Sequence, residues 1–210
     1  TVRRLRLEEN PTVTTFTAPG LQTIEASAVF NNNPMLIALS LPVLEETADL
    51  QVTGNTSLTA ISLPAIVAIH GRMWVAQNPA LTSVDLSMLT TTGTAEKADS
   101  GLAFVENDAL TSFAFPLLTM SHNKILVNSN LSLDTFSLPA LQAAKRELHI
   151  KSNPALTSFH MPELIEIGSE LVVSDNPSLA HCLIDALLSQ LDPDKSPSDP
   201  YVTFADNNEA

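Results

Sequence analysis

The chain has 210 residues, a formal net charge of -13 and a single cysteine. This length favours one domain over 1–210, and one cysteine excludes a disulfide-stapled scaffold or a Cys-rich zinc site. The acidic charge argues against binding to nucleic acid or to an anionic membrane surface. The sequence has no apolar run of about 18 residues, so we predict no insertion into a membrane.

An asparagine recurs along the chain at intervals of 22 or 23 residues, apart from one interval of 29. Proline follows five of these asparagines and recurs nine residues after six anchors, so the two positions hold eleven of the 14 prolines. A period of this length is typical of a solenoid with one structural unit per repeat. The eight anchors are Asn10, Asn33, Asn55, Asn78, Asn107, Asn130, Asn153 and Asn176.

Each repeat contains two short stretches in which apolar residues alternate with others. The first stretch has apolar residues five and three positions before the anchor, such as Leu50 and Val52, and the second has them six and eight positions after it, such as Phe113 and Phe115. A period of two predicts strands with one face inward, and the recurrent proline ends the second strand because it cannot donate to a ladder. We therefore expect a parallel β-solenoid of about eight 22–23-residue turns.

The anchor asparagines are interpreted as a buried ladder at one bend. A bend leaves main-chain N–H and C=O groups unpaired, and an amide side chain can satisfy both kinds. Exposed turn asparagines are the alternative. Asn55 and Asn130 also begin N-glycosylation sequons, which a buried ladder would make unusable.

Two segments depart from the repeat. The long interval holds a polar stretch at 90–100, which we predict to be an insertion loop, either neutral or carrying binding residues. Segment 180–191 has apolar residues at helical spacing and predicts a helix that caps the last turn, and 201–207 predicts a final strand. The N-terminus shows no such cap, so we expect further chain or a partner to flank it.

Three units show the repeat most clearly: NPALTSVDLSML at 78–89, NDALTSFAFPLL at 107–118 and NPALTSFHMPEL at 153–164. They resemble leucine-rich repeats of the receptor L-domain type, as found in bacterial and fungal cell-surface proteins, and the resemblance covers nearly the whole chain. It implies a right-handed solenoid dominated by β-structure, a helix at its end, and a secreted or cell-surface adhesion role. It also implies a second cysteine near the final strand, whereas Cys182 is alone, and we favour an inward core position for it over pairing beyond the chain.

The sequence does not suggest catalysis. His70 and His122 share a repeat position but lie two turns apart, about 10 Å, which is too far for one metal. His160 and His181 lie on neighbouring turns without an evident third ligand. The sequence shows no Gly-rich phosphate loop and no nucleophile beside a convincing base. We predict no enzyme activity, no cofactor and no metal site.

The outward positions of the first strands form the candidate binding surface. The single tryptophan, Trp74, is expected there at the middle of the rod, beside apolar neighbours that suggest a partner. The alternative is that Trp74 packs under a loop such as 90–100. Half of the ten basic residues lie on the same face, namely Arg4, Arg6, Arg72, Lys124 and Lys151. The candidate ligand-binding residues are Arg72, Trp74, Ala103, Val105, Lys124, Leu126, His149 and Lys151.

We predict a non-enzymatic extracellular recognition or adhesion module that binds a glycan or a protein at the cell surface. One alternative is a structural spacer of a longer cell-surface protein, with signal and anchor outside this chain. Another is an ice-binding solenoid that uses a flat Thr/Ser face on the second strands, which Ile37 and Asp134 interrupt. That face would comprise Thr14, Thr15, Thr17, Thr59, Ala60, Ser62, Thr82, Ser83, Asp85, Thr111, Ser112, Ala114, Thr157, Ser158 and His160.

Overall fold

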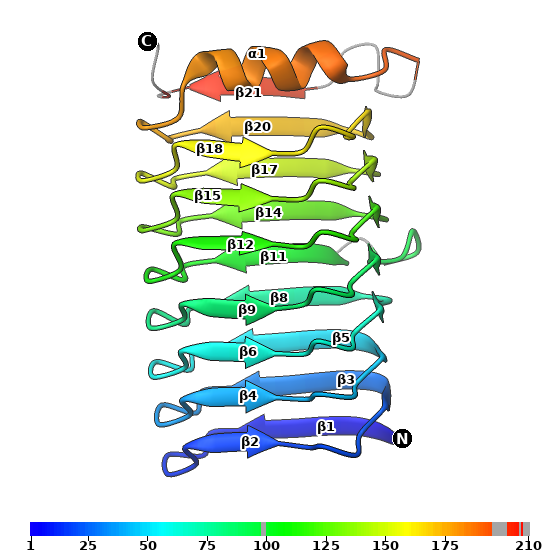
Figure 1. Ribbon diagram of the computed structural model, residues 1–210, viewed down its shortest axis with the longest axis vertical. Coiled ribbons are helices and arrows are strands. Elements are labelled where there is room, and N and C mark those ends of the chain that lie inside the picture. Colours follow the sequence, from blue (N-terminus) through cyan, green and yellow to red (C-terminus); the bar gives the residue numbers. More distant parts are fainter. Residues whose placement is uncertain (98–99, 195–200, 206, 208–210) are drawn as a thin grey trace.

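A computed structural model describes residues 1–97, 100–194, 201–205 and 207. The chain winds into a rod of stacked turns, with the N-terminus at one end and helix α1 (His181–Gln190) lying across the other (Figure 1). The strand pairs of the described chain are parallel, because each strand pairs with its equivalent one turn away. The predicted parallel β-solenoid with a helix near its C-terminal end is confirmed.

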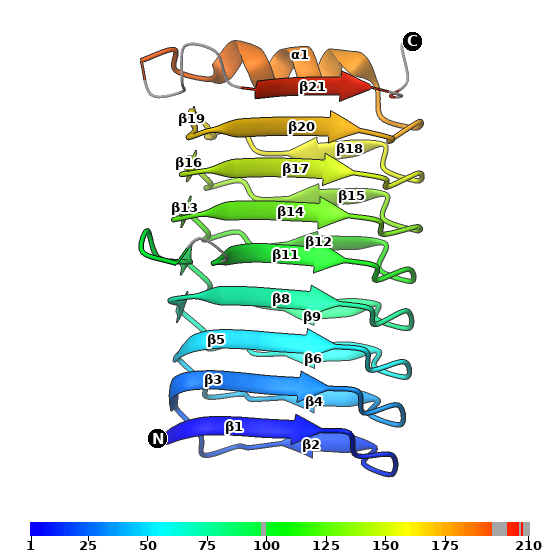
Figure 2. The same cartoon turned by 180° about the vertical axis from the view of Figure 1, so that it is seen from behind.

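The strands that precede the anchors form one continuous sheet along the rod (Figure 2). Register between turns follows the repeat, so that Phe104 pairs with Val75 on one side and with Val127 on the other, in spite of the long interval. The row consists of β1 (Val2–Glu8), β3 (Thr23–Asn31), β5 (Glu46–Thr53), β8 (Arg72–Ala76), β11 (Gly101–Val105), β14 (Lys124–Asn128), β17 (Glu147–Lys151), β20 (Glu170–Ser174) and β21 (Tyr201–Ala205).

The second strands of the turns form a shorter row on the opposite side of the rod (Figures 1 and 2). This row divides into two sheets, with the break between β9 and β12, in the long interval. Its members are β2 (Thr15–Thr17), β4 (Ala38–Ser40), β6 (Ala60–Ser62), β9 (Ser83–Asp85), β12 (Ser112–Ala114), β15 (Thr135–Ser137) and β18 (Ser158–His160).

A third row, of two-residue strands, was missed by the sequence analysis. These strands are too short to display an alternating pattern, so periodicity does not reveal them. In the early turns the third row is continuous with the first, since β5 pairs with both β7 and β8. Thr91 and Thr92, placed in the 90–100 insertion by sequence, belong to this row. Its members are β7 (Ala68–Ile69), β10 (Thr91–Thr92), β13 (Met120–Ser121), β16 (Ala143–Ala144) and β19 (Glu166–Ile167).

The inward residues of all turns merge into one core. Phe113, Phe136 and Phe159 stack along the rod, with centroids 5.3 Å and 5.9 Å apart, and Phe104 of the facing sheet stacks on Phe113 at 4.6 Å. Burying a large apolar side chain contributes roughly 1.5–3 kcal/mol, so each added turn stabilises its neighbours.

The anchor asparagines form the predicted ladder, and the seven from Asn33 to Asn176 are fully buried. Each buried Nδ2 donates to a main-chain carbonyl oxygen of the preceding turn at 2.8–3.1 Å. Each Oδ1 accepts the main-chain N–H of the anchor before it at 3.0–3.3 Å. The sequons at Asn55 and Asn130 are therefore closed to modification in the folded protein.

The residue before every anchor from Asn10 to Asn176 has a left-handed backbone, with φ between 55° and 69°. Only Gly54 among them is a glycine; the others include Gln77, Ser129 and Ser152. A left-handed conformation costs an L-residue roughly 1–2 kcal/mol. The ladder hydrogen bonds on either side offset this cost and hold the bend.

The C-terminal end departs from the two-strand turn. After Asn176 the chain forms α1, whose residues Ile184 and Leu187 are buried, and β21 then pairs with β20, which matches the helix and final strand predicted at 180–191 and 201–207. Asn207 continues the ladder by donating to Val173 O at 2.8 Å. The inward position expected for Cys182 is wrong: it is exposed, because the helix begins at His181 and strand alternation ends there.

Candidate functional site on the outer face of the first strands

The outer face of the first sheet presents three rows of side chains, four, two and six residues before the anchors. Parallel register aligns each row across the turns, so that Trp74 stands between Gln51 and Ala103, and Ala103 between Trp74 and Leu126. Since the inward positions of these strands are taken by the core, the outward positions are free to differ from turn to turn. The side chains that distinguish one turn from the next are therefore found on this face.

Trp74 points outward, as predicted, and is half-buried. The guanidinium carbon of Arg72 lies 5.4 Å from the centroid of the indole, which is a cation–π geometry. The main-chain N–H of Arg72 donates to Asp49 Oδ1 at 2.8 Å. A side chain at Gly71 would collide with that oxygen, since its Cβ would lie 2.2 Å away, so glycine is required for the approach.

A hollow of about 500 Å³ opens beside this stack, over the first three turns. It lies where β3 carries two residues, Glu25 and Ala26, opposite one residue of β5, a bulge that breaks the register. Both signs of charge line it: Arg4, Arg6 and Lys97 against Glu25 and Asp49.

Lys97 connects the insertion loop to this hollow. Its Nζ lies 3.5 Å from Asp49 Oδ2, across 48 residues of sequence. Ser100 Oγ closes the loop on itself, since it lies 2.8 Å from Thr94 O and 2.7 Å from Lys97 O, within reach of its hydroxyl hydrogen. The described part of the 90–100 stretch thus contributes a residue to the candidate site.

All eight predicted residues lie on one face, but two of the apolar residues among them are not exposed. Ala103 and Leu126 point outward, yet they are only 3% and 9% exposed. The expected contiguous exposed apolar patch is therefore wrong. The remaining members are half-buried and accessible, namely Arg72, Trp74, Val105, Lys124, His149 and Lys151.

Glu25, Asp49 and Lys97 were not among the predicted residues. Asp49 occupies an outward position in the same row as Arg72, so the repeat could have identified it. Glu25 and Lys97 lie on a bulge and on an insertion, where the repeat gives no register. A further outward group, Glu147, His149 and Glu170, lies on β17 and β20.

The threonines of the second strands do not form an unbroken flat face. Hydroxyls of Thr59 and Thr82 donate to main-chain carbonyl oxygens of the preceding turn at 3.1 and 3.2 Å, and that of Thr157 donates to Asp134 Oδ1 at 2.6 Å, so they support the stacking of turns. Ile37 and Asp134 interrupt the row and are exposed, and the sheet itself breaks between β9 and β12.

Comparison of the chain with family models, with curated proteins and with solved structures gave no match. In the part of the chain that the structure describes, no helix has the length and apolar character needed to cross a membrane.

Proposed function

We propose that this chain is a non-enzymatic recognition module that binds a glycan on the outer face of the first strands. The observation that carries the proposal is that Asp49 belongs both to the charged hollow and to the contact between Arg72 and Trp74. This carboxylate lines the polar hollow and also accepts the N–H of Arg72, whose guanidinium covers the Trp74 indole.

The chemistry of the face favours a carbohydrate over a protein. The part of the half-buried indole that stays accessible offers a flat apolar surface to a sugar ring, and the charged groups of the hollow can donate to and accept from hydroxyls. A protein interface needs a desolvated apolar centre, which the shielding of Ala103 and Leu126 removes. The insertion loop adds a second element to the site through Lys97.

The setting we propose is extracellular, at a cell surface, where such a module serves adhesion. The support for this setting is the resemblance of the NPxLTSxxLPxL units, such as 153–164, to receptor L-domain repeats. A rod with one variable face suits a long polymeric ligand, because neighbouring turns can contact successive sugar units.

The test uses Trp74 as the chain's single tryptophan. Its emission is recorded while a panel of soluble cell-wall polysaccharides is titrated into the protein. We expect one polysaccharide to shift or quench the emission saturably. By calorimetry with that polysaccharide, Arg72→Ala and Trp74→Ala should each bind at least about tenfold more weakly, in line with the loss of a central contact.

Arg146→Ala is the matched control, because Arg146 is exposed at a bend outside the face. It should bind as the unchanged protein does. Emission indifferent to every polysaccharide in the panel would contradict the proposal and favour the spacer function. Thermal hysteresis that is lost on Thr82→Asp would favour ice binding instead.

A further inference from the structure

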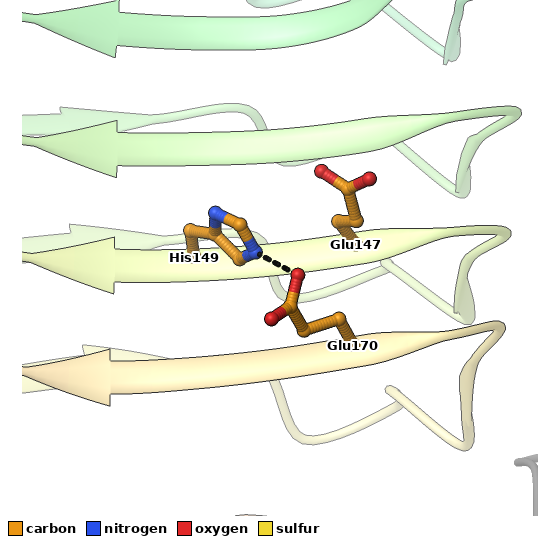
Figure 3. A group of neighbouring side chains, drawn as sticks. All are labelled: Glu147, His149 and Glu170. Carbon is orange, nitrogen blue, oxygen red and sulfur yellow. Dashed lines mark hydrogen bonds and ion pairs between the residues drawn. The ribbon is translucent and has the colours of Figure 1, made fainter. Parts of the chain in front are cut away.

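The second feature of the outer face is a set of three potential metal ligands near the C-terminal end. Glu147 and His149 are two residues apart on β17, so their side chains leave the same side of the sheet. Glu170 on β20 pairs in register with Glu147. One ligand atom from each of the three lies within 4.8 Å of the other two, and His149 Nε2 lies 3.0 Å from Glu170 Oε2 (Figure 3).

We propose that Glu147, His149 and Glu170 bind a divalent transition-metal ion of the zinc class. Two in-register carboxylates repel one another, and a cation held between them removes that repulsion. Donor atoms bonded to one zinc ion at about 2.0–2.2 Å must lie closer together than 4.8 Å. Small rotations of the two flexible glutamates supply this approach, because all three side chains are only half-buried.

The chemical types of the three ligand atoms determine which metal ions the group favours. An imidazole nitrogen with two carboxylate oxygens suits Zn²⁺, Co²⁺, Ni²⁺ or Cu²⁺, whereas Ca²⁺ and Mg²⁺ prefer sites made of oxygen alone. Three protein ligands on a solvent-facing sheet leave at least one coordination position open to water or to an added ligand. The chain's net charge of -13 favours cation binding, while Lys124 and Lys151 beside the site oppose it.

Other His–carboxylate pairs in the described chain lack this arrangement. His70 lies 3.4 Å from Glu46 and His181 lies 3.3 Å from Asp185, but only the β17–β20 group brings together three such ligands among the described residues. The metal group lies three strands from Trp74, about 14 Å along the sheet, so zinc binding can be measured separately from glycan binding at Arg72 and Trp74.

The experiment is calorimetric titration of the untagged chain with zinc chloride in a buffer that does not chelate metals. We expect one saturable site. His149→Ala and Glu170→Gln should each weaken zinc affinity at least about tenfold, and calcium chloride should give no binding at equal concentration. Zinc should also raise the melting temperature of the unchanged protein but not that of His149→Ala.

His70→Ala is the matched control, since it removes a histidine paired with one carboxylate only, and it should leave zinc affinity unchanged. Cys182→Ser tests the exposed thiol beside His181 as a competing site and should also leave affinity unchanged. The proposal is overturned if the unchanged protein takes up no zinc, if His149→Ala binds zinc as tightly, or if Cys182→Ser abolishes binding. Circular dichroism of each variant establishes that it is folded before its affinity is compared.

Discussion

The two sides of the first strands obey opposite rules. Inward, every turn repeats the same pattern, with apolar residues five and three positions before a buried asparagine. Outward, the residues of neighbouring turns vary along the middle row, which holds Gln51, Trp74, Ala103, Leu126 and His149. This difference shows that the stacking of turns restricts the residue type only at the inward positions, which pack against the next turn. The outward positions carry what is particular to this protein, and both proposals rest on them.

The substitution that tests the repeated inward pattern with the largest expected effect is Asn130→Ala. The change removes the Nδ2 donor to Phe104 O and the Oδ1 acceptor of the Asn107 N–H, so two buried main-chain groups lose these partners. We expect the free energy of unfolding to fall by about 2–6 kcal/mol, at roughly 1–3 kcal/mol for each of the two groups. Urea unfolding followed by circular dichroism measures the fall.

Asn128→Ala is the matched control on the same repeat. Asn128 lies on the outer face, and its Oδ1 has no hydrogen-bond partner among the described residues. We expect a change within about 0.5 kcal/mol. If the two substitutions lowered the free energy of unfolding equally, the buried ladder asparagine would contribute no more to stability than an asparagine on the outer face.

Substituting one aromatic residue on each side compares the core with the outer face directly. Phe136 is fully buried in the ring stack, so Phe136→Ala should lower the free energy of unfolding by about 3–5 kcal/mol. Trp74 stands outside the core, and Trp74→Ala should cost only about 1 kcal/mol, mainly from the lost contact with Arg72. Thermal unfolding of both variants measures the contrast, and a large loss for Trp74→Ala would place its ring in the core and weaken the binding proposal.

The smallest effect is expected at the bend itself. Ser152 has a φ of 55°, so Ser152→Gly should relieve left-handed strain and raise the free energy of unfolding by about 0.5–1 kcal/mol. Gly54→Ala is the reverse change, because its Cβ would meet Asn32 Oδ1 at 2.5 Å at a φ of 69°. The two shifts should have opposite signs in urea unfolding; a common sign would mean that the ladder does not impose this conformation.

The sequence was most informative at positions that have the same structural role in every turn. A buried anchor must satisfy the same bend in every turn, so the ladder from Asn10 to Asn176 could be predicted from spacing alone. The two-residue strands of the third row could not, because two residues carry no periodicity. Cys182 was misplaced because the strand register was carried one turn too far, into α1.

The candidate sites were only partly predictable. Glu147, His149 and Glu170 were accessible in principle, since 147 and 170 are 23 residues apart and 149 follows at strand spacing. His149 was among the predicted ligand-binding residues, but the two glutamates were not, because shared metal ligation was considered only between pairs of histidines. Lys97 could not have been found, because an insertion has no register with the strands it reaches.

The sequence by itself determined the parallel solenoid, the asparagine ladder, the capping helix and the outward direction of Trp74. These follow from a 23-residue period that one set of stacked turns satisfies. Only the tertiary structure decided that Ala103 and Leu126 are shielded, that a bulge in β3 opens a hollow, and that Lys97 reaches Asp49. The physical reason is that side-chain shielding, bulges and insertions depend on contacts between different turns, which a pattern within one turn does not encode.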